Sequence, residues 1–145
     1  MRKRIIQKIV LAAVIFQNNK ILILQRNKNE EIFPNMWELP SGKKEFLESS
    51  EDCLKREIKE ETGLAKIKII MPFSIFDYQI EKGKEIRDSI QINFLVKTTG
   101  FEKVRLSNEH QDFIWIEKER INQYELSKDA REAIRIAFEL KEKIF

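Results

Sequence analysis

The chain is poor in the residues that build disulfide bonds and nitrogen- or sulfur-ligated metal centres. Its 145 residues include one cysteine and one histidine. The lone Cys53 excludes an intramolecular disulfide and a zinc site built from cysteines, which is compatible with a reducing compartment. We therefore expect a cytoplasmic protein in which Cys53 is a small buried side chain with no chemical role.

Long apolar runs are also missing, and charge of neither sign is concentrated. No stretch approaches the roughly 20 apolar residues that a membrane-spanning helix needs, so we expect no membrane partner. The opening MRKRIIQKIVLAAVIF imitates a signal peptide, but QNNK interrupts the apolar run and ILIL resumes it, which indicates strand, turn and strand. The net charge of +3 comes from 27 basic and 24 acidic residues spread along the chain, so we do not expect binding to duplex nucleic acid.

The remaining composition, 42% hydrophobic and 35% charged, fits one compact domain over residues 1–145. Segments rich in Ile and Val predict strands, and the stretches QNNK and EKGKE predict the turns of two hairpins. The predicted strands are residues 5–16 and 21–26, a short strand in MWELP, and residues 67–79, 87–97 and 113–117.

Glycine and proline are scarce, with four and three residues, so we expect Gly42 and Gly63 where the backbone requires glycine. Ser49 fits an N-cap, acids follow it, and Gly63 fits a C′ position, which together predict a helix over residues 50–62. The last segment, SKDAREAIRIAFELKEKIF, has the apolar spacing of a second helix. Because strands precede and follow the first helix, we predict a mixed β-sheet with helices on its faces, an α/β/α sandwich.

Three acidic residues of the first predicted helix share one side of it. Glu57, Glu60 and Glu61 stand at i, i+3 and i+4, while Leu54 and Ile58 on a neighbouring face would anchor the helix to a sheet. Convergent carboxylates suit a hard divalent cation such as Mg²⁺ or Mn²⁺, which would relieve their repulsion and is often shared with substrate phosphates. For the glutamates alone, an acidic surface held by salt bridges to neighbouring basic residues explains the pattern as well or better.

The wider context favours the metal interpretation. From residue 42 the chain reads GKKEFLESSEDCLKREIKEETGL, which satisfies the pattern Gly, five residues, Glu, seven residues, Arg-Glu-apolar-x-Glu-Glu-x-Gly-apolar. This stretch, residues 42–64, resembles the signature box of the Nudix hydrolases, which is a specific signal because so many positions are fixed. The matching positions are Gly42, Glu48, Arg56, Glu57, Glu60, Glu61 and Gly63, with apolar Ile58 and Leu64.

The resemblance implies an α/β/α sandwich that hydrolyses a nucleoside diphosphate linked to another group, using a metal-activated water. It implies metal binding by Glu57, Glu60, Glu61 and the carbonyl of Gly42. Arg56 would hold the glutamates in place, and Glu48 would support the loop and the start of the helix. The chain departs from the family where glycines are frequent, with Ser41 before the box and Leu47 before its first glutamate.

The stretch MWELPSGKKE looks like the corresponding part of the MutT-type enzymes, which cleave nucleoside triphosphates to monophosphate and pyrophosphate. In that subgroup a loop glutamate contributes to the metal or base role, which makes Glu109, ahead of Trp115, the candidate fourth carboxylate. An exposed loop acid is an equal alternative. His110 could act as an acid or base near neutral pH, although we favour a solvated loop histidine.

Candidate substrate-binding residues come from the same resemblance and from the aromatic content. Asp129 falls where MutT-type enzymes place a base-reading side chain, and an acid at a helix start explains it equally well. Phe33, Trp37, Phe76 and Tyr78 could stack on a base, although core packing is the more common role of such residues.

The leading hypothesis is therefore a Mg²⁺-dependent hydrolase of a nucleoside triphosphate, including an oxidised one, with Mn²⁺ as a possible substitute. Nucleotide sugars, dinucleoside polyphosphates and capped RNA are alternative substrates. A Nudix-fold module that senses a nucleotide without turnover is a third hypothesis, which the intact box disfavours. A homodimer is the prior for a small enzyme, but no sequence feature demands one.

Overall fold

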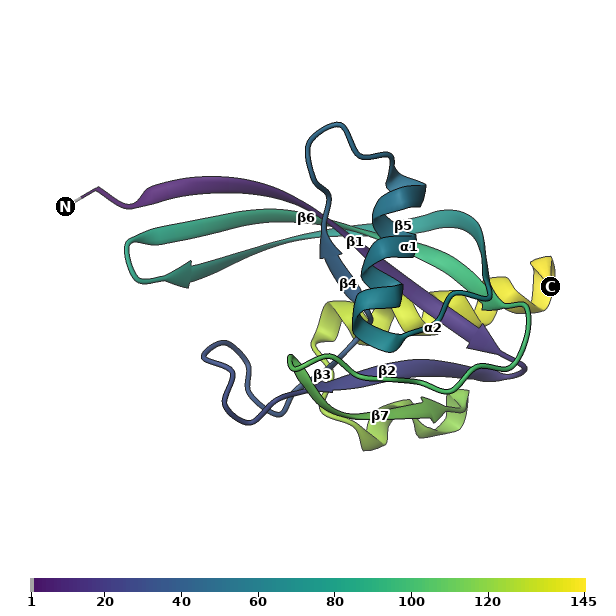
Figure 1. Cartoon of the computed structure of the whole chain (residues 1–145). Coiled ribbons are helices and arrows are strands. Elements are labelled where there is room, and N and C mark those ends of the chain that lie inside the picture. The colour runs from purple at the N-terminus through teal and green to yellow at the C-terminus, as the bar shows by residue number, and fades with distance from the viewer. Residues whose placement is uncertain (1) are drawn as a thin grey trace.

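The computed structural model describes residues 2–145 as a mixed β-sheet with a helix on each face (Figure 1). Helix α1 covers one face and α2 the other, so the predicted α/β/α sandwich is confirmed. The described part of the chain contains no helix long and apolar enough to cross a bilayer. Along the chain the elements are β1 (Arg4–Gln17), β2 (Lys20–Arg26), β3 (Trp37–Glu38), β4 (Ser41–Lys43), α1 (Ser50–Thr62), β5 (Ile67–Lys82), β6 (Glu85–Thr98), β7 (His110–Ile116), the 3₁₀ helix η1 (Lys118–Gln123) and α2 (Lys128–Ile144).

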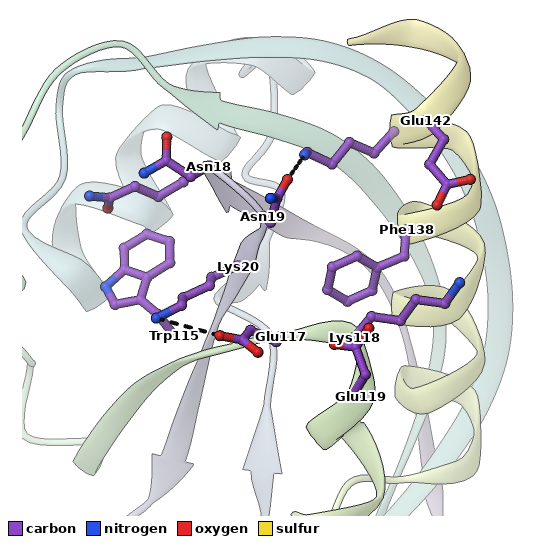
Figure 2. A pocket seen from close by; sticks show the side chains of 11 residues that line it. Asn18, Asn19, Lys20, Trp115, Glu117, Lys118, Glu119, Phe138 and Glu142 are labelled. Carbon is purple, nitrogen blue, oxygen red and sulfur yellow. Dashed lines mark hydrogen bonds and ion pairs between the residues drawn. The ribbon is translucent and has the colours of Figure 1, made fainter.

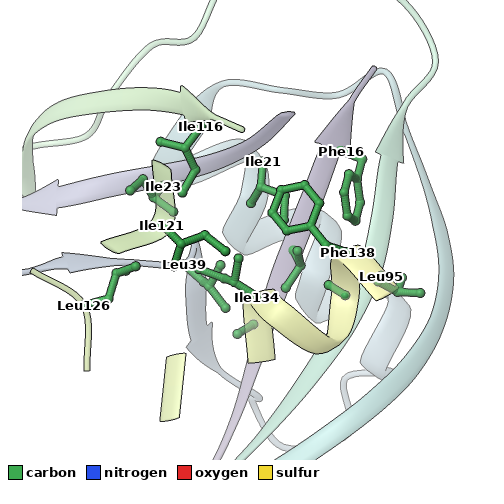
Figure 3. Packing of buried hydrophobic residues seen from close by; sticks show 13 residues of the cluster. Phe16, Ile21, Ile23, Leu39, Leu95, Ile116, Ile121, Leu126, Ile134 and Phe138 are labelled. Atoms are coloured by element: carbon green, nitrogen blue, oxygen red, sulfur yellow. The ribbon is translucent and has the colours of Figure 1, made fainter. Parts of the chain in front are cut away.

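Strand β1 separates the two cores because successive side chains of a strand point to opposite faces. Leu11, Ala13 and Ile15 belong to the buried cluster that includes Leu54 and Ile58 of α1, whereas Ala12, Val14 and Phe16 belong to the cluster that includes Ile134 and Phe138 of α2. Figure 3 shows the second cluster, in which the rings of Phe16 and Phe138 meet edge to face with centroids 5.3 Å apart. Leu54 and Ile58 therefore anchor α1 to the sheet as expected.

The sheet has the order β3-β2-β1-β6-β5, with β4 paired to β1 and β7 paired to β2. Strand β1 is parallel to β6, and the other pairs are antiparallel. The first half of β1 and the β5–β6 hairpin extend beyond the body of the molecule (Figure 1). We call this extension the arm, formed by residues 4–9, 77–82 and 85–90.

Both hairpins and the helix over residues 50–62 occur as predicted, and Asn18 takes φ 55° in the first turn. Other boundaries differ. Residues 41–43 were expected in a loop but form β4, because β1 supplies backbone partners to a short segment that has no strand signal of its own. Strand β7 begins at His110, ahead of the predicted residue 113, because its pairing with β2 continues past a register shift to Arg26. The 3₁₀ helix η1 was not predicted.

Candidate functional site

Helix α1 presents its glutamates from a well-defined position. The Ser49 hydroxyl accepts a hydrogen bond from the Asp52 N–H at 3.1 Å, and Gly63 ends the helix at φ +76° with its N–H bonded to the Lys59 carbonyl. Both are the capping contacts that the sequence predicts. Because the apolar face of α1 is buried, the orientation of its acidic face is determined by the core.

Gly42 lies directly against the carboxylate of Glu57. A Cβ atom built on Gly42 would overlap the Cδ, Oε2 and Cγ atoms of Glu57. Gly42 belongs to β4, which pairs with Leu11 of β1, so the sheet positions this backbone. Glycine is thus required here by the close approach of a carboxylate, and Gly42 and Glu57, which the sequence predicts in one site, lie side by side.

Arg56 connects the loop before α1 to two of the glutamates. Its Nε and Nη2 atoms donate to the two oxygens of Glu48 at 2.8 and 2.9 Å, and its Nη1 donates to Glu57 Oε1 at 2.5 Å. Nη1 also lies 3.6 Å from Glu60 Oε2, and Nη2 donates to the Lys43 carbonyl at 3.1 Å. The Arg56 hydrogen bonds hold the pKa of Glu48 at about 2, which keeps Glu48 ionised.

Leu47, one of the departures from the family, adopts a left-handed conformation with φ 63°, and its side chain is fully exposed. A non-glycine residue in this region is strained by its Cβ. We expect Leu47→Gly to raise the free energy of unfolding by up to about 1 kcal/mol, measured by urea denaturation, since relief of strain exceeds the entropy that glycine adds to the unfolded chain. Phe46→Gly, at an equally exposed neighbour, should not stabilise the protein.

Glu61 is the buried member of the trio, with 6% of its surface exposed. Its Oε1 accepts the Ser41 N–H at 2.9 Å. Burial raises the pKa of Glu61 to about 9, and the nearby Glu38, Glu109 and Glu57 carboxylates act in the same direction. Burial also raises the pKa of Glu57, against the effect of Arg56. A cation is the group that would stabilise the ionised form of both.

The raised pKa of Glu61 makes the stability of the folded protein depend on pH. Between pH 4.5 and about 9 the unfolded chain has released the Glu61 proton while the folded chain retains it. Stability therefore falls as pH rises, by up to about 1.4 kcal/mol per pH unit. We expect urea denaturation of metal-free protein from pH 5 to pH 9 to show this fall, and Glu61→Gln to reduce it. An equal slope in Glu61→Gln would contradict the assignment, and the exposed Glu139→Gln is the control.

Glu109 and His110 lie beside Glu61 at the start of β7. One ligand atom from each of the three residues lies within 4.8 Å of the others. Glu109, the predicted fourth carboxylate, is thus brought to the glutamate patch. The preference for a solvated His110 is wrong, since this residue is 4% exposed and its Nε2 lies 2.8 Å from Glu38 Oε2. Sequence reasoning also missed Glu38, although the prediction of a strand in MWELP placed it next to Trp37.

The three box glutamates do not meet at one point. Like charges repel, and Arg56 pairs with Glu57 and Glu60 on one side of the patch. Glu61 turns to Ser41 on the other side, next to Glu109. The patch therefore has two halves, and the second opens into the cavity that the predicted substrate-binding residues line.

That cavity, of about 440 Å³, is lined by Glu61 and Glu109 together with the β3 region, the loop before it, the arm and the start of α2. All the predicted substrate-binding residues line it, namely Phe33, Trp37, Phe76, Tyr78 and Asp129. The rings of Phe76 and Tyr78 are 5.8 Å apart, and burial raises the pKa of Tyr78. Basic residues that were not predicted also line it, namely Arg26, Lys82 and Arg87.

A second cavity, of about 810 Å³, lies between the β1–β2 turn, the end of β7 and α2 (Figure 2). Two of the lysines that line it have partners within it. Lys141 donates to Asn19 Oδ1 at 2.6 Å, and Lys20 lies 3.9 Å from Glu117. None of the box glutamates lines it, so the smaller cavity is the candidate site.

The NUDIX domain family matches residues 7–136 of this chain. The chain belongs to the Nudix family. The predicted box at residues 42–64, which holds the acidic face of α1, the loop bound by Arg56 and the glycine of β4, lies within the matched residues. The Nudix fold expected from the resemblance is confirmed, and the protein is a Nudix hydrolase.

Relatives point to the MutT-like branch of the Nudix hydrolases. Nucleoside triphosphatase NudI of Escherichia fergusonii is 26% identical over 133 residues, which cover 88% of this chain and 94% of that protein. The MutT protein of Methanosarcina mazei has a structure similar to this Nudix domain, with a TM-score of 0.72, 27% identity and 99% of each chain covered. The Caenorhabditis elegans Ap4A hydrolase, with a TM-score of 0.76, 22% identity and coverage of 95% and 99%, shares the fold.

Proposed function

We propose that this Nudix hydrolase cleaves a nucleoside triphosphate, including oxidised forms, to nucleoside monophosphate and pyrophosphate with Mg²⁺, or Mn²⁺ in its place. The observation that carries the proposal is the cavity of about 440 Å³, in which carboxylates, aromatic rings and basic side chains meet. A nucleoside triphosphate would use all three kinds of group. Its base can stack on the aromatic rings, its phosphates can bind the basic side chains, and its metal ion can bind the carboxylates. The similarity to nucleoside triphosphatase NudI and to a MutT protein supports the same substrate class.

The donor set fits a hard divalent cation. The residues that would hold it are Glu57, Glu60, Glu61, the Gly42 carbonyl and Glu109, all of which offer the oxygen ligands that Mg²⁺ prefers. When bound, the metal would neutralise phosphate charge and lower the pKa of a bound water. Arg56 keeps Glu57 and Glu60 oriented, and Glu48 fixes Arg56 through two hydrogen bonds, so these two residues position the ligands.

The other walls of the cavity suit the remaining parts of the substrate. Phe33, which is 58% exposed, and Trp37 and Tyr78 offer rings on which a base can stack. Asp129 at the start of α2 can accept hydrogen bonds from exocyclic amino groups. Arg87 and Lys82 on the arm can bind phosphate oxygens by charge-assisted hydrogen bonds.

The alternative substrates, the cellular location, the partners and the oligomeric state expected from the sequence stay predictions. Nucleotide sugars, dinucleoside polyphosphates and capped RNA carry the same diphosphate linkage, and a nucleotide-sensing module would bind without turnover. Location in the cytoplasm, the absence of a membrane or duplex nucleic-acid partner, and a homodimer are likewise predictions. Sedimentation velocity would measure the oligomeric state.

A substrate panel tests the proposal directly. Nucleoside triphosphates, 8-oxo-dGTP, ADP-ribose, a nucleotide sugar and a diadenosine polyphosphate are each incubated with Mg²⁺, with Mn²⁺ and with chelator, and pyrophosphate and phosphate are measured separately. We expect metal-dependent release of pyrophosphate from a triphosphate and its absence in Glu57→Gln. Turnover confined to another class would reassign the substrate. A nucleotide that raises the melting temperature without turnover would favour the sensing module.

A further inference from the structure

His110 is a buried histidine whose surroundings are determined by strand register. It lies opposite Arg26 of β2, and Glu38 of β3 lies opposite Leu24. Positions 24 and 26 share a face of β2 because side chains alternate along a strand. Glu38 and His110 are thereby brought together, with 2.8 Å between His110 Nε2 and Glu38 Oε2.

The contact with Glu38 determines which ring nitrogen remains available. An ionised carboxylate can only accept, so Nε2 donates and the neutral ring keeps its lone pair on Nδ1. Among the residues that the structure describes, Nδ1 is a buried side-chain atom with no hydrogen-bond partner. A buried polar atom without a partner costs free energy, so Nδ1 marks a position where a ligand would be stabilising.

Two carboxylates lie next to this histidine. One ligand atom each of Glu61, Glu109 and His110 lies within 4.8 Å of the others. Ligands of one ion with bonds of about 2.1 Å are at most about 4.2 Å apart, so a small contraction would complete the site. Glu61 Oε1 is bonded to Ser41, which leaves Oε2 for a cation, and the exposed Glu109 can adjust.

We propose that His110 Nδ1, Glu61 and Glu109 form a mixed nitrogen–oxygen cation site that binds a transition-metal ion such as Zn²⁺ or Co²⁺ in preference to Mg²⁺. Imidazole nitrogen favours these ions, whereas Mg²⁺ prefers oxygen ligands alone. Glu38 has the position of the carboxylate that accepts the second N–H of a metal-bound histidine and orients its ring. The inference goes beyond the proposed hydrolysis, since it concerns which cation binds and through which atom.

The chain itself supplies a specific probe, because His110 is its one histidine. Tag-free protein labelled with ¹⁵N-histidine therefore gives imidazole nitrogen signals from this residue alone. We expect addition of Zn²⁺ to give Nδ1 the large shift of direct coordination while Nε2 keeps its proton, and Mg²⁺, which prefers the carboxylates, to give Nδ1 no such shift. An unmoved Nδ1 signal at a zinc concentration that calorimetry shows to be saturating, or binding through Nε2, would overturn the proposal.

Calorimetry with the same protein tests the carboxylate half of the site. We expect Zn²⁺ to bind at least about 10-fold more tightly than Mg²⁺, and Glu109→Gln to weaken Zn²⁺ binding at least about 10-fold. Asp112→Asn is the matched control, an exposed acid in the same strand, and should leave the affinity unchanged. Equal affinities for the two ions, or an unaltered affinity in Glu109→Gln, would contradict the site. Failure to hydrolyse any nucleotide would leave these measurements unaffected, so the two proposals are tested separately.

Discussion

Gly42→Ala is expected to lower kcat/KM at least about 10²-fold while the protein remains folded. The new Cβ would occupy the space of the Glu57 carboxylate, so the side chain of Glu57 must move away from β4. A side-chain end can move without unfolding the sheet, but a displaced metal ligand loses an interaction that acts on the reacting phosphate. Steady-state kinetics on the preferred substrate of the panel, with circular dichroism as the test of folding, measures the effect.

Gly100→Ala is the matched control for this variant. It makes the same chemical change at a glycine whose added Cβ would meet only the flexible side chain of Lys66 at 3.1 Å. We expect activity close to that of the unmodified protein. Near-normal kcat/KM in Gly42→Ala would show that activity does not depend on the position of the Glu57 carboxylate next to Gly42. The assignment of this pair to the metal site would then be withdrawn.

Arg56→Lys is expected to cost at least about 10²-fold in kcat/KM, and Arg56→Ala more. The guanidinium binds both oxygens of Glu48 and at the same time holds Glu57 and Glu60. A lysine keeps the charge but offers a compact ammonium, which cannot reproduce this planar set of contacts. The loss should appear mainly in kcat, because the ligands are misplaced and the walls of the cavity are unchanged.

A second measurement separates positioning by Arg56 from a general loss of positive charge. Without the guanidinium, the pKa of Glu48 should rise from about 2 towards its ordinary value, which carboxyl ¹³C NMR titration would detect. Lys55→Ala is the control, because this neighbouring basic residue of the same helix forms its ion pair, 2.9 Å long and exposed, with Glu51, which is not a box glutamate. Full activity of Arg56→Lys would indicate that a positive charge at position 56 is sufficient for activity and that the planar contacts of the guanidinium are not needed.

Local chemistry determined what could be predicted from the sequence. The caps Ser49 and Gly63 act within a few residues, so the bounds of α1 were predicted correctly. The fixed spacing of the box likewise predicts Gly42, Arg56 and the glutamates as residues of one site. The α/β/α sandwich followed from the alternation of strand and helix patterns.

Contacts between distant segments could not be predicted in this way. His110 carries no sequence signal of burial, because its environment arises from β3 and β7 pairing with the same end of β2. The same holds for β4, which needs β1 as its partner, and for Arg87, which lies on the arm and lines the cavity. The register of the strands, which the sequence pattern does not reveal, therefore determines which distant residues lie together at the site.

The parallel pairing of β1 with β6 also affects how the chain can fold. Arg4 pairs with Glu85 and Phe16 with Lys97, so each contact closes a loop of about 80 residues. Such non-local pairing slows folding, and during synthesis the apolar segment of β1 must wait until β6 has been made. We therefore expect refolding in milliseconds to seconds and aggregation of nascent chains that end before β6.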